Sequence, residues 1–304
     1  MATTMTAPVG NTIALAQKFV PMLDEVYKRE SLTSIFDTQN SRVDWTGANK
    51  VNLFNITAVG LANYSRNAGY VPGDTDGSWE PYQLSQDRGR SFSVDAMDDE
   101  ETLGMMMGNL LGQFERTQVV PEIDAYRFAK WAGTTGVDGA TATIAANADV
   151  AALIDAAEAS MDDNEVPYEG RVLFVNPLIY SQLKGNIERR IINSENNVNT
   201  NVEFYDDMRI IRVPSARFNT VVTINAPTTS SGAGGYTASG VGINFMIIHP
   251  SAILQVVKHN PIRIFSPSVN QEADAYKLNY RMYHDTFVLA NKVKGIYVHK
   301  KSST

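Results

Sequence analysis

The 304-residue chain contains no cysteine. This absence excludes disulfide frameworks, cysteine-ligated zinc, iron–sulfur clusters and thiol nucleophiles, and it fits a reducing cytoplasm. A chain of this length buries about three quarters of its unfolded surface, so it needs no disulfide or metal to fold. No apolar run approaches the roughly 18 residues needed to cross a membrane, and no basic segment precedes the N-terminal apolar residues as in a signal peptide. We therefore expect no membrane contact.

The sequence also lacks the signatures of catalysis. None of the four histidines lies in a zinc-binding HExxH pattern, and there is no Gly-x-Ser-x-Gly nucleophile elbow. The glycine-rich stretch 231–235 lacks the Lys-Ser/Thr pair that completes a phosphate-binding loop. Residues 74–77 resemble part of a calcium loop, but Gln83 stands where that loop needs glutamate, so we expect a plain turn. We expect no enzymatic activity, no metal and no cofactor.

Charge is distributed unevenly along the chain. Residues 1–207 contain 30 acidic and 15 basic side chains, whereas residues 208–304 contain 3 acidic and 11 basic ones. Two interpretations stay open: the two parts meet surfaces of opposite sign, on the same molecule or on further copies, or the charges simply solvate separate faces. The net charge of −7 disfavours a DNA-binding domain, because neutralising phosphates requires clustered Lys and Arg.

The first 96 residues predict a helix and a long excursion. Apolar residues at helical spacing predict an amphipathic helix over about 13–27, after a polar tail. Further on, Val51 and Leu53 indicate one strand, alternating residues 91–96 indicate another, and the stretch 69–77 between them is rich in turn residues. The simplest interpretation is a two-stranded excursion with an irregular tip, and an ordinary sheet is the alternative. A lone hairpin is marginally stable in water, so an excursion would need support from a partner or another domain.

The clearest helix start is at Asp98. Asp98 and Glu101 have capping-box spacing, and the acids of residues 98–101 suit the positive end of a helix dipole. Apolar residues then repeat at helical spacing as far as Lys130, and Pro121 predicts either a kink in one long helix or a junction of two helices. The same acids would suit an acid–base enzyme, but capping the helix is the simpler role.

After Gly133 the pattern alternates between helices and strands. We expect helices over 149–161 and 177–183, strands at 171–175, 213–215, 221–224 and 243–248, a loop over 227–240, and several short strands between 253 and 298. Residue patterns alone therefore predict a mixed α/β protein with an arm and an extended hairpin.

Four stretches add a more specific indication. They are Arg66 with Gly69–Gly73, Asp87–Asp95, the acidic Asp98–Thr102, and Val120–Arg127. With the order of the elements, they resemble the major capsid proteins of tailed bacteriophages with the HK97-type fold. The resemblance covers nearly the whole chain and implies an α+β fold with an N-arm, an extended β-hairpin E-loop, a long spine helix, and peripheral and axial domains. It implies a structural subunit that self-assembles into the icosahedral shell around a double-stranded DNA phage genome.

The resemblance also implies a division of the chain and a set of partners. Residues 1–40 would be the N-arm, 41–96 the E-loop over a neighbouring subunit, 97–132 with 266–304 the peripheral domain, and 133–265 the axial domain. The partners would be further copies in hexamers and pentamers, a separate scaffolding protein, the portal, a cement protein, and enclosed DNA through weak nonspecific contact. The location would be the virion capsid, assembled in the host bacterial cytoplasm.

The assembly contacts that we infer involve residues of the E-loop and of the acidic helix start. They are Arg66, Tyr70, Trp79, Arg88, Arg90, Asp98, Asp99, Glu100 and Glu101. We expect Arg88 and Arg90 to pair with acids 98–101 of another copy. Some family members cross-link through an E-loop lysine; residues 64–90 contain none, so we expect noncovalent shells. Because the arm begins near Met1, we expect no N-terminal scaffolding region in this chain.

Three alternatives remain at this point. An encapsulin-type nanocompartment shell would have the same fold but enclose an enzyme cargo. An α/β hydrolytic enzyme would use carboxylates near Asp98 and would need an enclosed pocket in which their pKa values are raised. A phage tail tube or another virion protein would form tubes or rings instead of closed shells.

Overall fold

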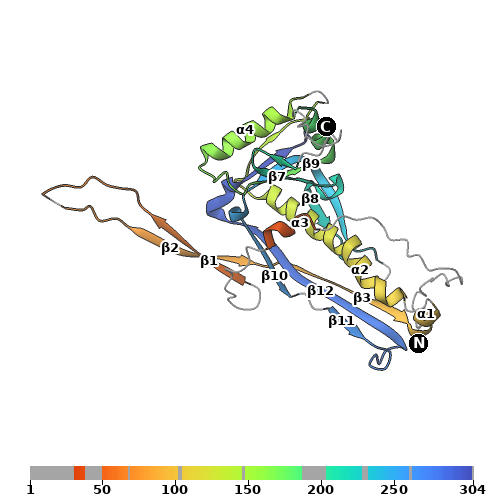
Figure 1. Ribbon diagram of the computed structural model, residues 1–304. Helices are drawn as coiled ribbons and strands as arrows, with labels where there is room; N and C mark the ends of the chain where they lie inside the picture. The colour runs from red at the N-terminus through yellow and green to blue at the C-terminus, as the bar shows by residue number, and fades with distance from the viewer. Residues whose placement is uncertain are drawn as a thin grey trace, which may run out of the picture.

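The computed structural model describes residues 31–37, 50–67, 69–101, 105–145, 148–186, 203–227, 232–259 and 262–302. The helix expected over 13–27 lies outside these residues. Figure 1 shows three parts: a hairpin that projects far from the body, a long helix that runs beside a narrow sheet, and a larger sheet flanked by helices. In the described ranges, no helix is long and apolar enough to span a membrane.

The projecting hairpin consists of β1 (Lys50–Ala58) and β2 (Thr75–Gln83), which pair antiparallel with Phe54 opposite Trp79. Residues 59–74 form its tip, where a bridge joins Ser65 to Gly69. Gly69 has a φ of 78°, a left-handed conformation that glycine adopts without steric cost. The expected excursion is therefore present, but its return strand is β2 and not residues 91–96.

Residues 91–96 lie mostly in β3 (Gln86–Asp95), which pairs with β12 (Ala275–Val288) along its whole length. The alternation that predicted a strand is real, because even-numbered residues of β3 are more buried than odd-numbered ones. The pairing with β1 was wrong. The apolar face of β3 is covered by the long helix of the body, so β3 forms part of the body and not of the excursion.

The narrow sheet is built around β12. β3 pairs with one edge of β12, and β10 (Ile253–His259) and β11 (Ile262–Phe265) pair with the other edge, one after the other. Leu278 and Tyr280 of β12 are buried, and the Tyr280 ring contacts Phe114 of the long helix. The helix therefore covers one face of this sheet, as Figure 1 shows.

The long helix runs through Pro121 without a break. It comprises α2 (Met105–Phe114), a π-helical turn η2 (Glu115–Val119) and α3 (Val120–Gly133), and the short helix α1 (Ala96–Glu101) precedes it in the sequence. The Val120 N–H donates to the Glu115 carbonyl, five residues back, and Val119 has helical dihedral angles. Pro121 lacks an N–H and would clash in a regular turn, and the wider π turn just before it relieves both problems. We therefore find continuation through a π turn instead of a sharp kink.

Helix α1 begins earlier than the helix start expected at Asp98. The Asp95 carboxylate accepts a hydrogen bond from the Met97 N–H at 2.9 Å, so Asp95 caps the helix and Asp98 lies inside α1. The expected helix over 149–161 is confirmed as α4 (Val150–Asp163), and Asp149 caps it by accepting from the Ala152 N–H at 3.3 Å.

The larger sheet has the strand order β4 (Asp138–Thr141), β13 (Ile296–Lys300), β9 (Tyr236–Ile248), β5 (Val172–Val175), β7 (Met208–Arg212) and β6 (Phe204–Tyr205), with β8 (Asn219–Ile224) paired to β9. Helices α4 and α5 (Pro177–Asn186) pack on one face, and α3 packs on the other. The body also contains the 3-10 helices η3 (Ser215–Arg217), η4 (Pro250–Ala252) and η5 (Ala290–Gly295), and residues 34–37 are 3-10 helical as well.

Two local expectations in this sheet were wrong. We expected a strand at 213–215, but β7 ends at Arg212. Pro214 has no N–H to donate to a neighbouring strand, and the 3-10 helix η3 follows it. The loop expected over 227–240 is shorter, because β9 begins at Tyr236.

The sheets also cross the expected domain limits. β10 and β11 fall within 133–265 but pair with β12 in the narrow sheet, whereas β13 falls within 266–304 but lies between β4 and β9 in the larger one. Strand patterns reveal that a segment is extended, but they do not identify its partner. These sheet assignments rest on pairings between segments far apart in the sequence.

Candidate assembly interface

One face of the hairpin is apolar and exposed. Phe54, Ile56 and Trp79 are 48%, 72% and 66% exposed, and they lie on one face because opposite residues of an antiparallel pair share a face. The Phe54 and Trp79 rings have centroids 5.0 Å apart. A Cβ atom on Gly77 would lie 2.5 Å from the Phe54 ring, so a larger residue there would displace this ring. This strip is a surface that its own subunit leaves open to water.

The tip continues this apolar character. Tyr64 and Tyr70 are exposed with ring centroids 4.9 Å apart, and Leu61 and Val71 are exposed beside them in the sequence. Arg66 is also exposed and is the only basic residue between 51 and 87. Tyr70, Trp79 and Arg66, three of the contact residues expected from the sequence, therefore lie on the projecting part of the molecule (Figure 1).

The root of the hairpin is held firmly by the body. The Asp285 carboxylate is fully buried and accepts from the Ser85 N–H and hydroxyl, each at 2.9 Å, and from the Tyr126 hydroxyl at 2.9 Å. Lys130 of α3 also donates to Asp285. The apolar side of the root is a cluster that comprises Val51, Leu84, Leu254, Val256 and Phe287. The direction in which the hairpin leaves the body is therefore set by β12 and α3.

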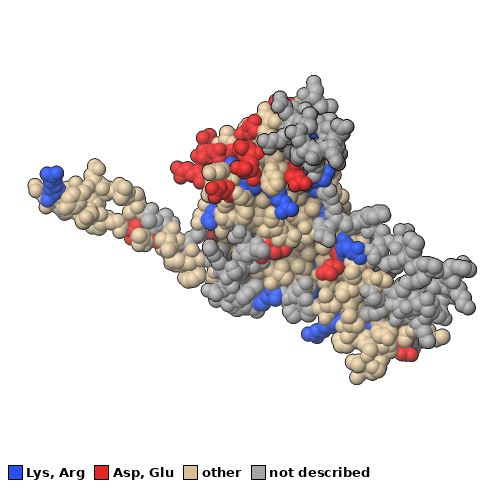
Figure 2. Space-filling model, in the orientation of Figure 1, with Lys and Arg blue, Asp and Glu red and all other residues tan. Residues whose placement is uncertain are grey.

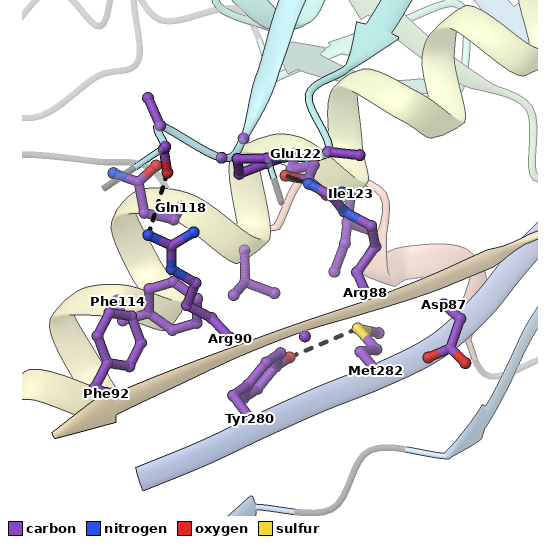
Figure 3. A pocket seen from close by; sticks show the side chains of 18 of the residues that line it. Asp87, Arg88, Arg90, Phe92, Phe114, Gln118, Glu122, Ile123, Tyr280 and Met282 are labelled. Carbon is purple, nitrogen blue, oxygen red and sulfur yellow. Dashed lines mark hydrogen bonds and ion pairs between the residues drawn. The ribbon is translucent and has the colours of Figure 1, made fainter. Parts of the chain in front are cut away.

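Arg88 is bonded within its own subunit. Its guanidinium donates to both Glu122 oxygens, at 2.7 and 3.2 Å (Figure 3). It also donates to the Asn225 carbonyl at 2.8 Å. Arg90 donates to the Gly232 carbonyl at 3.2 Å. Arg88 thus joins β3, α3 and the chain after β8, which differs from the ion pair that we expected with another copy. Sequence spacing did not reveal this pairing.

A cavity of about 490 Å³ lies between β3, β12 and the π turn (Figure 3). Its carboxylates, Asp87 and Glu122, are ion-paired with Arg281 and Arg88. Burial, followed by the nearby Arg127, lowers the pKa of the lining His284 to about 4, so this ring is neutral. Asp98 does not line the cavity. Across the part of the chain that the structure describes, no group of acidic and histidine side chains could hold a metal.

The acidic helix start lies in α1. Asp98 is half-buried there, and the structure describes only the backbone of Asp99, Glu100 and Glu101. Elsewhere, acidic side chains gather at the end of the molecule that carries α4 (Figure 2). Burial, followed by Asp206, raises the pKa of Glu158 on α4 to about 7. This acidic region belongs to the first, acidic part of the chain.

A buried charged network holds residues 31–37, and sequence analysis missed it. The Asp124 carboxylate on α3 accepts from the Thr33 hydroxyl at 2.8 Å and from Arg217 at 3.0 Å. Arg127, also on α3, donates to Thr33 at 2.8 Å and to Asp37 at 3.2 Å. A signal was present, because Asp124 and Arg127 occupy the helical face shared by apolar Val120 and Trp131.

Phe36 completes this attachment. Its side chain is buried, with its ring centroid 5.8 Å from that of Trp131 and 5.9 Å from that of Phe174. Residues 31–37 therefore form part of the core of the body.

Comparison with known proteins agrees with this architecture. None of the curated protein sequences matches the chain significantly. The capsid of the cyanophage P-SCSP1u is similar with a TM-score of 0.64 and 13% identity over 95% of this chain and 93% of that one. The structure from Mycobacterium phage Che8 has a TM-score of 0.62 and 14% identity over 95% and 98%, and the mature capsid of bacteriophage PhiM1 has 0.59 and 14% over 95% and 92%.

These similarities show the fold, and the sequence family shows the role. The family model described as phage capsid protein matches residues 79–297, which is most of the chain. The match supports a structural, non-enzymatic role and favours neither a nanocompartment shell nor a hydrolase. The HK97-type α+β fold expected from the sequence is confirmed. The chain belongs to the phage capsid protein family, and its role is that of a structural subunit of a phage shell.

Proposed function

We propose that this subunit joins its neighbours in the shell chiefly through the β1–β2 hairpin, which lies on an adjacent copy. The observation that carries the proposal is the exposed strip of Phe54, Ile56 and Trp79 on a hairpin with a firmly held root. Full burial of a large apolar side chain contributes about 1.5–3 kcal/mol, so covering this strip would supply several kcal/mol at each contact. The contact repeats around each ring of subunits, which multiplies its effect.

The proposed chain division follows the sheets. Residues 1–40 form the N-arm, the projecting part of 41–96 forms the E-loop, and the remaining chain forms peripheral and axial domains. The peripheral domain contains the narrow sheet with β10 and β11, and the axial domain contains the larger sheet with β13. This division is supported by the strand pairings of β12 and β9.

The proposed partners complete the picture of a capsid. Copies assemble as hexamers and pentamers in the host bacterial cytoplasm, with a separate scaffolding protein, a portal and a cement protein. Arg66, Tyr70, Trp79, Arg90 and the acids of residues 98–101 contribute contacts between copies, whereas Arg88 supports the subunit itself. The shell is noncovalent and without enzymatic activity, and it holds DNA by weak contact because the subunit carries a net charge of −7.

Electron microscopy of particles from the purified chain, with a scaffolding protein present, tests this proposal. We expect closed icosahedral shells whose subunits run as single 33.4 kDa chains on denaturing gels. Trp79→Asp should abolish shells and leave the melting temperature of the subunit unchanged, because Trp79 is largely exposed on the projecting hairpin and is not part of the core. Val221→Asp is the matched control, since Val221 is also exposed but lies on β8. Normal shells from Trp79→Asp would contradict the proposal.

A further inference from the structure

The narrow sheet has an open edge at β11. β11 pairs with β12 on one side, and no other described strand pairs with it. Ile262 and Ile264 are 41% and 59% exposed, and Arg263 between them is exposed as well. Ile264 lies opposite the buried Leu278 and therefore on the face that the long helix covers further along the sheet. β11 thus presents two uncovered isoleucines on one face and a cation on the other.

The hairpin has an open edge at β2. Pro81 lies in the ladder opposite Asn52 and has no N–H, so its nitrogen must point away from β1. Backbone groups alternate in direction along a strand, so the outward donors belong to Trp79, Gly77 and Thr75. An exposed edge of this kind is a template for a strand from another chain.

The two edges match in their alternation. Along β2, Gly77 and Trp79 share the apolar face, and Asp76 and Glu80 share the other. Along β11, the isoleucines share one face and Arg263 occupies the other. The other edge of the hairpin offers no such match, because residues 51–58 of β1 contain no acidic side chain.

We propose that β2 of one copy pairs along β11 of a second copy, so that the hairpin extends the narrow sheet of its neighbour. Directly opposite residues share a face, so Trp79 lies with the isoleucines and Glu80 lies with Arg263. The opposite alignment would set Trp79 against Arg263 and an acid against isoleucine. The inference rests on the proposed function and names the neighbour's surface that receives the hairpin.

A second copy of this chain is the partner that the charges favour. The β2 edge is acidic and the β11 edge is basic, so one chain carries both halves of a head-to-tail contact. Contacts between unlike patches generate rings when the rotation closes. Pairing with β11 would also stabilise the hairpin, because a hairpin of only two strands is marginally stable in water.

Engineered disulfides test the pairing, because the chain has no cysteine of its own. Trp79→Cys is combined in one chain with Ile262→Cys, or with Ile264→Cys. The hairpin projects away from the end of the body that carries β11, so such a disulfide must join two copies (Figure 1). Assembled particles should give a ladder of multimers on non-reducing denaturing gels. Trp79→Cys with Val221→Cys is the control and should give none.

Charge exchange provides a second test that needs no cysteine. Arg263→Glu should lower the yield of particles, and adding Glu80→Arg to the same chain should restore it. Particles without a ladder from either cysteine pair, or no rescue by Glu80→Arg, would overturn the pairing and leave the proposed function intact. If the unaltered chain forms no particles with its scaffolding protein, the proposed function fails instead.

Discussion

Asp124 is the residue on which the attachment of residues 31–37 depends most. Its carboxylate is fully buried and accepts hydrogen bonds from the Ser31 hydroxyl at 3.0 Å, the Leu32 N–H at 3.1 Å and the Thr33 hydroxyl at 2.8 Å. Arg217, whose side chain is 3% exposed, donates to the same carboxylate at 3.0 Å. Asp124→Ala removes these bonds together and deprives the buried Arg217 of this carboxylate.

The cost follows from burial of the charge. Removing one partner of a buried ion pair costs about 3–5 kcal/mol, because the remaining charge loses its compensation. A total stability of about 5–15 kcal/mol is typical of a folded domain, so the loss is a large fraction of it. We expect the free energy of unfolding to fall by about 4 kcal/mol. Replacing both partners, as Asp124→Leu with Arg217→Met, should cost less than Asp124→Ala, because neither charge of this pair remains in the core.

Urea unfolding of the unassembled subunit measures these differences. Hydrogen exchange supplies a local readout, because the Leu32 and Thr33 amides donate to Asp124 and should exchange faster in Asp124→Ala. A loss below about 0.5 kcal/mol, the range of ordinary surface substitutions, would refute the reasoning. A double variant less stable than Asp124→Ala would refute the part that concerns the charge.

Three further predictions concern Arg88, His284 and Glu158. Arg88→Glu should lower the melting temperature of the isolated subunit more than Arg88→Lys, because it sets two carboxylates together at Glu122; equal melting temperatures would contradict this. The pKa of His284 is lowered from 6.5 to about 4, so stability should decrease by up to about 3 kcal/mol as the pH falls through this window. In urea unfolding, the stability of His284→Gln should depend less on pH over the same range. The pKa of Glu158 is raised from 4.5 to about 7, so stability should fall as the pH rises through this window. Glu158→Gln should raise the melting temperature above pH 7 but not below pH 4.5. An equal change of melting temperature at both pH values would exclude the charge of Glu158 as the cause.

Local sequence patterns predicted part of the hairpin but not its return strand. Val51 and Leu53 predicted the outgoing strand, and the turn-rich stretch predicted the irregular tip. The return strand was placed at residues 91–96, because their alternation is clearer than that of β2. β2 contains Gly77 and Pro81, which weaken a strand pattern, although here Gly77 makes room for the Phe54 ring.

Sequence patterns likewise identified some of the functional residues and misassigned or missed others. Tyr70 and Trp79 were inferred from their residue type and lie exposed on the hairpin. Arg88 was inferred from the charge alone, and its bond to Glu122 depends on how β3 packs against α3. Asp124 and Arg127 were overlooked, because charged residues within a helix usually face solvent, whereas these two meet residues 31–37 in the core.

The sequence by itself determined which segments are helical or extended, the limits of α4 to within a few residues, and the family resemblance. These properties depend on residues close together in the chain, where periodicity and capping act directly. Only the tertiary structure decided that β3 pairs with β12, that β13 joins β9, and that Phe36 enters the core beside Trp131. Such contacts join segments far apart in the sequence, and many strands offer the same alternation. Packing selects one pairing among these strands, because it buries one face of each strand in the core and leaves the other face open to solvent or to a neighbouring subunit.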